Sequence, residues 1–175
     1  MKRSLPSGAA RRARADWPPP GSSGNGARMT VDIQTLLRDA AKRGALVRDL
    51  ATVVEEEVSS KKGLGGMAIK AAFGLVTGAR PGFLKEAIDY LLDGLAEGIR
   101  PILDQGRASG LSVGAALQAD RSRTASALLE VVDQRANKAS NQGLRKAYER
   151  LRGSAQKQVE EAVPRLAATL DRHFT

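Results

Sequence analysis

The sequence predicts an all-helical domain, and three observations lead to that fold class. Apolar residues recur at the three- and four-residue spacing of a helix face along most of the chain. No stretch alternates apolar and polar residues as a half-buried strand does. The hydrophobic content of 42% is mostly Ala, Leu and Val with only 3% aromatic residues, which favours close helix packing over a β-sandwich. A chain of 175 residues can form one domain with a substantial core, so we expect a compact bundle of about six to seven helices over residues 29–175.

The first 28 residues differ from the rest of the chain because they are rich in Arg, Pro and Gly. They carry six Lys and Arg residues against Asp16, which is +5 of the total net charge of +9. No apolar stretch follows the arginines, so the segment does not have the pattern of a secretory signal. We expect either a disordered basic tail or upstream sequence ahead of a true start at Met29. We favour the second, because a helix start follows Met29 at once.

Two helices are expected after Met29. Asp32 is a good N-cap for the first, and Gly44 would interrupt the helical pattern. A second helix over residues 45–59 ends in the acidic run Glu55–Glu57, whose side chains cannot converge on one ligand because consecutive residues lie about 100° apart on a helix. The apolar stripe of the first helix consists of Ile33, Leu36, Leu37 and Ala40.

The third expected helix, from about residue 63 to 78, is almost uninterruptedly apolar. Only Lys70 and Thr77 break its surface, which predicts burial nearly all round. Gly74 and Gly78 would permit close helix approach. Lysines near an apolar run are also typical of surface-active peptides, but the run is shorter than the ~20 residues needed to cross a bilayer. We therefore expect central burial in the bundle.

The fourth expected helix covers residues 81–106, with a kink or break at Pro101. Its apolar side predicts a core position, and its opposite side is acidic. The chain has no histidine near this face that could complete a carboxylate metal site. We interpret the face as solvated, with a docking surface for a basic partner as the alternative. The acidic residues are Glu86, Asp89, Asp93 and Glu97.

The remaining chain predicts a helix over 113–138 interrupted near Asp120, and a turn at Asn141 and Gly143. A short helix anchored by Leu144, Tyr148 and Leu151 would follow. A last helix would run from Ser154, bent at Pro164.

Basic residues cluster on the short helix and could form a surface for an anionic ligand. Glutamates are interleaved with them, so a salt-bridged surface is the default interpretation and nucleic-acid binding is not favoured. The basic residues in question are Arg145, Lys146, Arg150 and Arg152.

Catalytic and cofactor motifs are missing from the sequence. There is no cysteine, and the one histidine, His173, lies next to the C-terminus, where a catalytic triad is improbable and a role at a helix end is favoured. Gly63, Gly65 and Ala68 match G-x-G-x-x-A, but a charged helix and not a strand precedes them, so a turn between helices is the better interpretation. We expect no cofactor, no metal and no enzymatic activity.

Four stretches in order resemble a bacterial family of short proteins classed as a domain of unknown function. They are VRDLATVVEEEVSSKKGLGG, AIKAAFGLVTGARPGF, ALLEVVDQRANKASN and LRKAYERLRGSAQKQVEEAVPRL. The resemblance spans residues 31–173 and implies an all-helical protein. It carries no assigned activity and no site residues.

These observations lead us to expect a cytoplasmic, non-enzymatic structural or protein-interaction module, which associates with itself or with a protein partner. One alternative is a carrier that binds a small molecule or lipid between its helices. Another is a basic protein associated with nucleic acid or a membrane surface.

Overall fold

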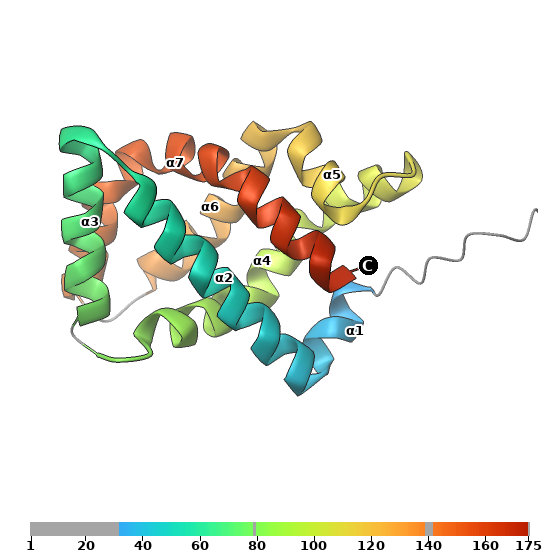
Figure 1. The fold of residues 1–175 in the computed structure, drawn as a ribbon, viewed down its shortest axis with the longest axis horizontal. Coiled ribbons are helices and arrows are strands. Elements are labelled where there is room, and N and C mark those ends of the chain that lie inside the picture. The colour runs from blue at the N-terminus through green and yellow to red at the C-terminus, as the bar shows by residue number, and fades with distance from the viewer. Residues whose placement is uncertain (1–31, 79, 139–141, 175) are drawn as a thin grey trace, which may run out of the picture.

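The computed structural model describes residues 32–78, 80–138 and 142–174. Within these ranges the chain forms seven helices and no strand (Figure 1), which confirms the all-helical prediction. The predicted tail, the predicted start at Met29 and Asn141 lie outside the described residues. The helices are α1 (Ile33–Arg38), α2 (Ala40–Ser60), α3 (Gly63–Gly78), α4 (Phe83–Ala108), α5 (Val113–Ala119), α6 (Arg121–Asn137) and α7 (Gln142–Phe174).

The two longest helices, α4 and α7, organise the bundle. Helix α7 packs against α2, α5 and α6, and α4 packs against the same three helices from another side. Figure 1 shows α3 upright at one end of the molecule, while α1 and the end of α7 lie toward the other end. The hydrophobic core therefore sits between α4 and α7, away from α3.

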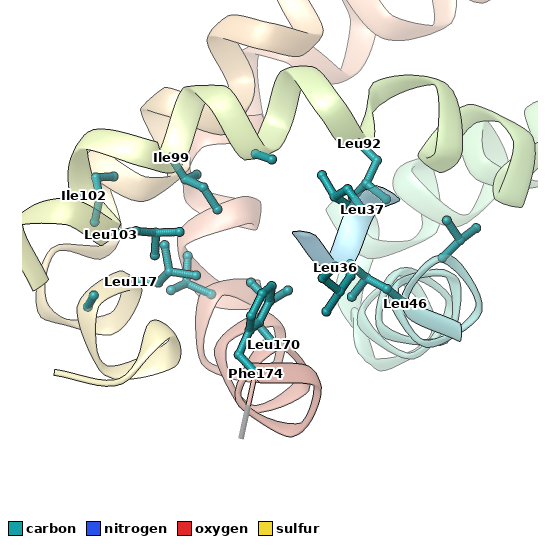
Figure 2. Packing of buried hydrophobic residues seen from close by; sticks show 14 residues of the cluster. Leu36, Leu37, Leu46, Leu92, Ile99, Ile102, Leu103, Leu117, Leu170 and Phe174 are labelled. Carbon is teal, nitrogen blue, oxygen red and sulfur yellow. The ribbon is translucent and has the colours of Figure 1, made fainter. Parts of the chain in front are cut away.

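The core is built by α1, α2, α4, α5 and α7 (Figure 2). Leu117 and Val163 are completely shielded from solvent. Leu170 and Phe174 bring the last turns of α7 into the same cluster, so the C-terminal end is anchored. The remaining buried members are Leu36, Leu37, Leu46, Val47, Leu92, Ala96, Ile99, Ile102, Leu103 and Ala116.

Side-chain caps fix two of the helix boundaries. The Asp39 carboxylate accepts hydrogen bonds from the backbone N–H groups of Ala41 and Lys42, at 3.0 and 3.1 Å, and so starts α2 directly after α1. The predicted break at Gly44 is wrong, because this capped start carries α2 through the glycine. Asp120 caps α6 through the Arg123 N–H at 2.9 Å, which confirms the predicted interruption near Asp120.

Helix α7 is continuous where two helices were predicted. Gly143 lies inside it, and Pro164 is accommodated without a break, as is Pro101 in α4. Proline keeps a helical φ and removes one backbone donor, so a helix held by packing on either side can continue through it. Tyr148 and Arg152, about one turn apart, both bind α6, and these contacts favour one helix across the predicted joint.

Candidate docking surface

Helix α3 is buried on one side only. It packs against α2, α4 and α7 through Gly66, which is buried, and through the partly buried Ile69 and Phe73. The predicted burial nearly all round is therefore wrong. The physical reason is position: α3 stands at the end of the bundle (Figure 1), and no other described element covers its far side.

The uncovered side of α3 is apolar along its length. Leu64, Met67 and Leu75 are 83%, 59% and 72% exposed, and Ala68 and Ala71 are exposed between them. The spacing of three, four and seven residues places all five on one helix face. Large apolar side chains on such a face are unusual for a surface without a partner. We call Leu64, Met67, Ala68, Ala71 and Leu75 the outward face.

Gly74 and Gly78 do not mark a close approach to another helix, contrary to the prediction. A Cβ atom added at Gly65, Gly74 or Gly78 would meet no atom within 4 Å. Gly66 is the exception: there a Cβ would lie 2.7 Å from the backbone carbonyl carbon of Lys61. The glycine at position 66 thus fits α3 against the end of α2, while the others face open space.

The sequence around α3 is basic. Residues 58–85 contain five Lys and Arg residues and no Asp or Glu. Lys61 is used inside the molecule, where its Nζ lies 2.8 Å from a carboxylate oxygen of Glu161 and 3.5 Å from one of Glu57. The hydrogen bond from Lys61 holds the pKa of Glu161 below its usual range. Lys61 therefore ties the start of α3 to α7.

The other cations near α3 are less engaged. Arg80 forms an ion pair with Glu86. Lys62, Lys70 and Lys85 make no ion pair with any described residue. Lys62 also lines an open cleft of about 570 Å³ between α2, α3 and α7. Lys62, Lys70 and Lys85 thus lie on or next to α3 in the sequence and have no carboxylate partner within the described ranges.

The predicted acidic face of α4 is occupied by contacts within the molecule. The Arg43 guanidinium of α2 donates from Nε to Asp89 at 2.6 Å and from Nη1 to Asp93 at 2.9 Å. These hydrogen bonds keep the pKa of Asp93 below its ordinary value and raise that of Arg43. Glu97 accepts a hydrogen bond from the Gln34 side chain at 2.9 Å, and Glu86 pairs with Arg80 as described above.

The four carboxylates thus fasten α1, α2 and the α3–α4 connection to α4. They remain half-exposed or more, and their use as a surface for a basic partner stays a prediction.

The predicted basic cluster on α7 is divided between paired and unpaired residues. Arg145 lies 3.4 Å from Glu149, and Arg152 binds Asp133 of α6 through two hydrogen bonds of 2.7 and 2.9 Å. Lys146 and Arg150 are exposed and make no ion pair within the described part of the chain. Their role as an anionic-ligand surface also stays a prediction.

Asp133 is the acceptor for two groups of α7. The Tyr148 hydroxyl donates to it beside Arg152. The hydrogen bonds from Arg152 and Tyr148 lower the pKa of Asp133, while burial raises that of Tyr148. This three-residue contact joins α6 to the first turns of α7.

The residues considered for catalysis and for dinucleotide binding lie in the first or last turns of helices. His173 is mostly buried, and its Nε2 lies 2.9 Å from the Asp49 carboxylate, so it joins α7 to α2. Gly63 and Gly65 follow α2, a helix, so the strand that a dinucleotide fingerprint requires is not the element before them. Among the described side chains, no three His, Cys, Asp or Glu residues are grouped to hold a metal ion.

The sequence predicts the helix α3 and its apolar character, but it led us to expect this helix in the core. The signal that could have corrected it is charge: an apolar helix flanked by cations, without one carboxylate from residue 58 to 85, is unusual for a helix at the centre of a bundle. None of the described helices is both long enough and apolar enough to cross a membrane.

Comparison with known proteins identifies the family. Residues 33–174 match the model of a family of unknown function (DUF6918), and the chain belongs to this family. The match confirms the resemblance inferred from the four sequence stretches. No curated protein and no solved structure gives a significant match to the chain.

Proposed function

We propose that this member of the family of unknown function is a non-enzymatic domain that associates with an anionic lipid surface through the outward face of α3. The observation that carries the proposal is the exposure of Leu64, Met67 and Leu75 on one face of a helix at the end of the bundle. A helix of this kind lies in the plane of a lipid interface, with its apolar side chains below the headgroups.

Charge favours anionic lipid as the occupant of the face. Lys70 lies on α3 and Lys62 directly before it, both without a carboxylate partner among the described residues. Long lysine side chains can reach headgroup phosphates while their methylene stems follow the apolar surface. Each Lys or Arg near an anionic membrane contributes about 1 kcal/mol to binding. The cytoplasmic leaflet of a membrane carries such lipids, so we propose a cytoplasmic location.

A second copy of the chain fits the face less well. A two-fold contact pairs the same patch on both subunits, so residues near the middle of α3 would meet their own equivalents. Lys70 lies at the middle of α3, and the residues from 58 to 85 supply no carboxylate to oppose it. Like charges would therefore lie near each other at the edge of a dimer contact, whereas lipid phosphates would neutralise them.

The test is co-sedimentation of the full chain with vesicles of phosphatidylcholine, with and without phosphatidylglycerol. We expect binding to the mixed vesicles and little to pure phosphatidylcholine. The double variant L64N/L75N should weaken binding by about tenfold or more, because each leucine loses apolar burial in the interface. Leu111→Asn is the matched control: Leu111 is 43% exposed, follows α4 and lies outside α3.

Charge variants separate α3 from the α7 cluster. We expect K62Q/K70Q to lower binding to phosphatidylglycerol vesicles by about thirtyfold, since two cations that contribute about 1 kcal/mol each are removed from the interface. K146Q/R150Q removes two unpaired cations from α7 and should leave binding unchanged. The reverse pattern would assign lipid binding to α7 and refute the proposal.

The full chain keeps its basic N-terminal residues in every variant, so their contribution is constant. Unchanged vesicle binding in L64N/L75N would mean that residues other than the outward face bind lipid, and the proposal would be wrong. Light scattering on the same samples detects the competing occupant. A dimer that L64N/L75N dissociates, in a protein that does not bind vesicles, would assign the face to a second copy.

A further inference from the structure

The cleft between the end of α2, the start of α3 and the middle of α7 has a polar lining. Its volume of about 570 Å³ is within the range of small-molecule binding sites. The residues of α3 that line it include Gly66 and Ile69, which pack toward the bundle, and no member of the outward face. The cleft therefore lies on the opposite side of α3 from the outward face.

Two lysines line the cleft without a carboxylate partner. Lys62 follows the end of α2 and Lys157 belongs to α7, and neither forms an ion pair with any described residue. A phosphate monoester carries a charge of about −1.5 to −2 at neutral pH, and lysine is a common ligand of phosphate groups. Cations from two different elements can thus act on one phosphate group.

The two carboxylates of the lining are already bound by cations. Glu161 lies 2.8 Å from the Nζ of Lys61. Glu57 lies 3.5 Å from the same atom and 3.3 Å from the Nε of Arg165. The lining as a whole contains three lysines and two glutamates, so one positive charge is left over for a bound anion.

The remaining polar groups of the lining are hydrogen-bond acceptors. The hydroxyls of Ser60 and Ser154 donate to backbone oxygens three residues earlier in their own helices, at 2.8 and 3.2 Å, so each hydroxyl oxygen can still accept. The side-chain oxygen of Gln158 is buried and accepts no hydrogen bond from any described residue. Buried acceptors without a donor are uncommon, and a ligand hydroxyl would supply one. The lining thus suits a molecule that carries both a phosphate and hydroxyl groups.

We propose that this cleft binds the phosphate monoester of a small polyol from solution, with the phosphate between Lys62 and Lys157 and hydroxyl groups donating to Ser154 and Gln158. The first turn of α3 also lines the cleft, and the N-terminus of a helix favours an anion. A soluble ligand fits better than a lipid headgroup, because the cleft and the outward face lie on opposite sides of α3. The inference does not depend on lipid binding by the outward face.

The test is calorimetric titration of the full chain with glycerol 3-phosphate, inorganic phosphate and glycerol. We expect glycerol 3-phosphate to bind about tenfold more tightly than inorganic phosphate, because its hydroxyl groups add two hydrogen bonds, and glycerol not to bind. Lys157→Gln should weaken binding of glycerol 3-phosphate by about tenfold, since a charge-assisted hydrogen bond is lost. Lys146→Gln is the matched control, because Lys146 is an exposed lysine of α7 that has no ion pair with a described residue and lies outside the cleft.

A second variant tests the hydroxyl contacts. Gln158→Leu should leave the binding of inorganic phosphate unchanged and reduce the preference for glycerol 3-phosphate to about threefold, because one hydrogen bond is lost. Circular dichroism checks the folding of each variant. Equal binding of glycerol 3-phosphate and inorganic phosphate, no effect of Lys157→Gln or of Gln158→Leu, or no binding of glycerol 3-phosphate at millimolar concentration would each overturn the proposal.

Vesicle binding by the same variants distinguishes this site from the outward face. L64N/L75N should bind glycerol 3-phosphate normally, and Lys157→Gln should bind phosphatidylglycerol vesicles normally. Failure of the two proposals can therefore be told apart. A loss of vesicle binding in Lys157→Gln would assign the cleft to a lipid headgroup and refute the soluble ligand.

Discussion

Helices α3 and α4 are neighbours in sequence, yet they use their apolar residues in opposite ways. Helix α4 buries its apolar side in the core and pairs its acidic side with α1 and α2. Helix α3 packs one side on the bundle and leaves an equally apolar side uncovered. The comparison teaches that an apolar helix becomes central only when other helices surround it, and that the periodicity of one helix does not reveal how many neighbours it has.

The largest difference in the free energy of unfolding is expected between substitutions of buried and of exposed leucines. Leu117 is fully shielded in the core, so Leu117→Ala should lower the free energy of unfolding by about 2–5 kcal/mol. Leu64→Ala removes a side chain that is 83% exposed and should change it by less than about 0.5 kcal/mol. Urea unfolding monitored by circular dichroism checks both. A cost above 1 kcal/mol for Leu64→Ala would show that the outward face is covered in the free protein.

Substitution of glycine by alanine should have opposite effects on stability in α4 and α3. A Cβ at Gly106 of α4 would collide with the Cβ of Ala116, so Gly106→Ala should destabilise the domain by about 1–3 kcal/mol. Gly74 of α3 has open space around it, and Gly74→Ala should stabilise the domain by about 0.4–1 kcal/mol, because alanine lowers the entropy of the unfolded chain. Thermal unfolding should therefore shift in opposite directions. Equal shifts would contradict the positions of the two helices.

Loss of the ion pairs on the acidic side of α4 should change the free energy of unfolding by a smaller amount. Arg43→Gln removes the cation between Asp89 and Asp93 and should cost about 1 kcal/mol, because the three groups are partly exposed to solvent. Lys70→Gln, on α3, removes a cation without an ion pair to any described residue and should cost nothing measurable. If Arg43→Gln were also neutral, the acidic side of α4 would not be holding α2 in place.

The smallest expected effect is a loss of stability in acid. The pKa values of Asp93 and Asp133 are lowered by hydrogen bonds from Arg43 and Arg152. Stability from a lowered carboxyl pKa is present above the unfolded value of about 3.9 and is lost as the pH falls through the folded value. The melting temperature should therefore decline below about pH 4, and less steeply in R43Q/R152Q than in the unchanged chain. A decline of the same slope in both proteins would exclude these two pairs as the source.

Much of the helical architecture could be predicted from the sequence because it depends on local patterns. The interruption near Asp120 and the apolar side of α4 depend on residues within single segments, and the structure confirms both. The break at Gly44 and the split of α7 failed because a glycine or a turn-like pair weakens a helix by an amount that packing can outweigh. Burial of α3 failed because it depends on the arrangement of the other helices.

The candidate sites show the same limit. The sequence identified an apolar third helix with lysines near it, but only the fold shows that one apolar side of this helix faces outward. The contact between Arg135 and Tyr90 could not be predicted, since the two residues lie on different helices and are 45 residues apart in the chain. The partners of the predicted acidic face could not be predicted either, because Arg43 and Gln34 come from elsewhere in the sequence.

The most direct test of the central claim uses the absence of cysteine from the chain. Met67→Cys, on the outward face of α3, is labelled with an environment-sensitive fluorophore such as NBD and mixed with phosphatidylglycerol vesicles. Leu111→Cys, outside α3, carries the same label as the control. We predict a blue shift and a rise in intensity for the label at position 67 and no change at position 111. A protein that binds the vesicles while the label at position 67 remains in water would contradict the claim that the outward face of α3 is the lipid-binding surface.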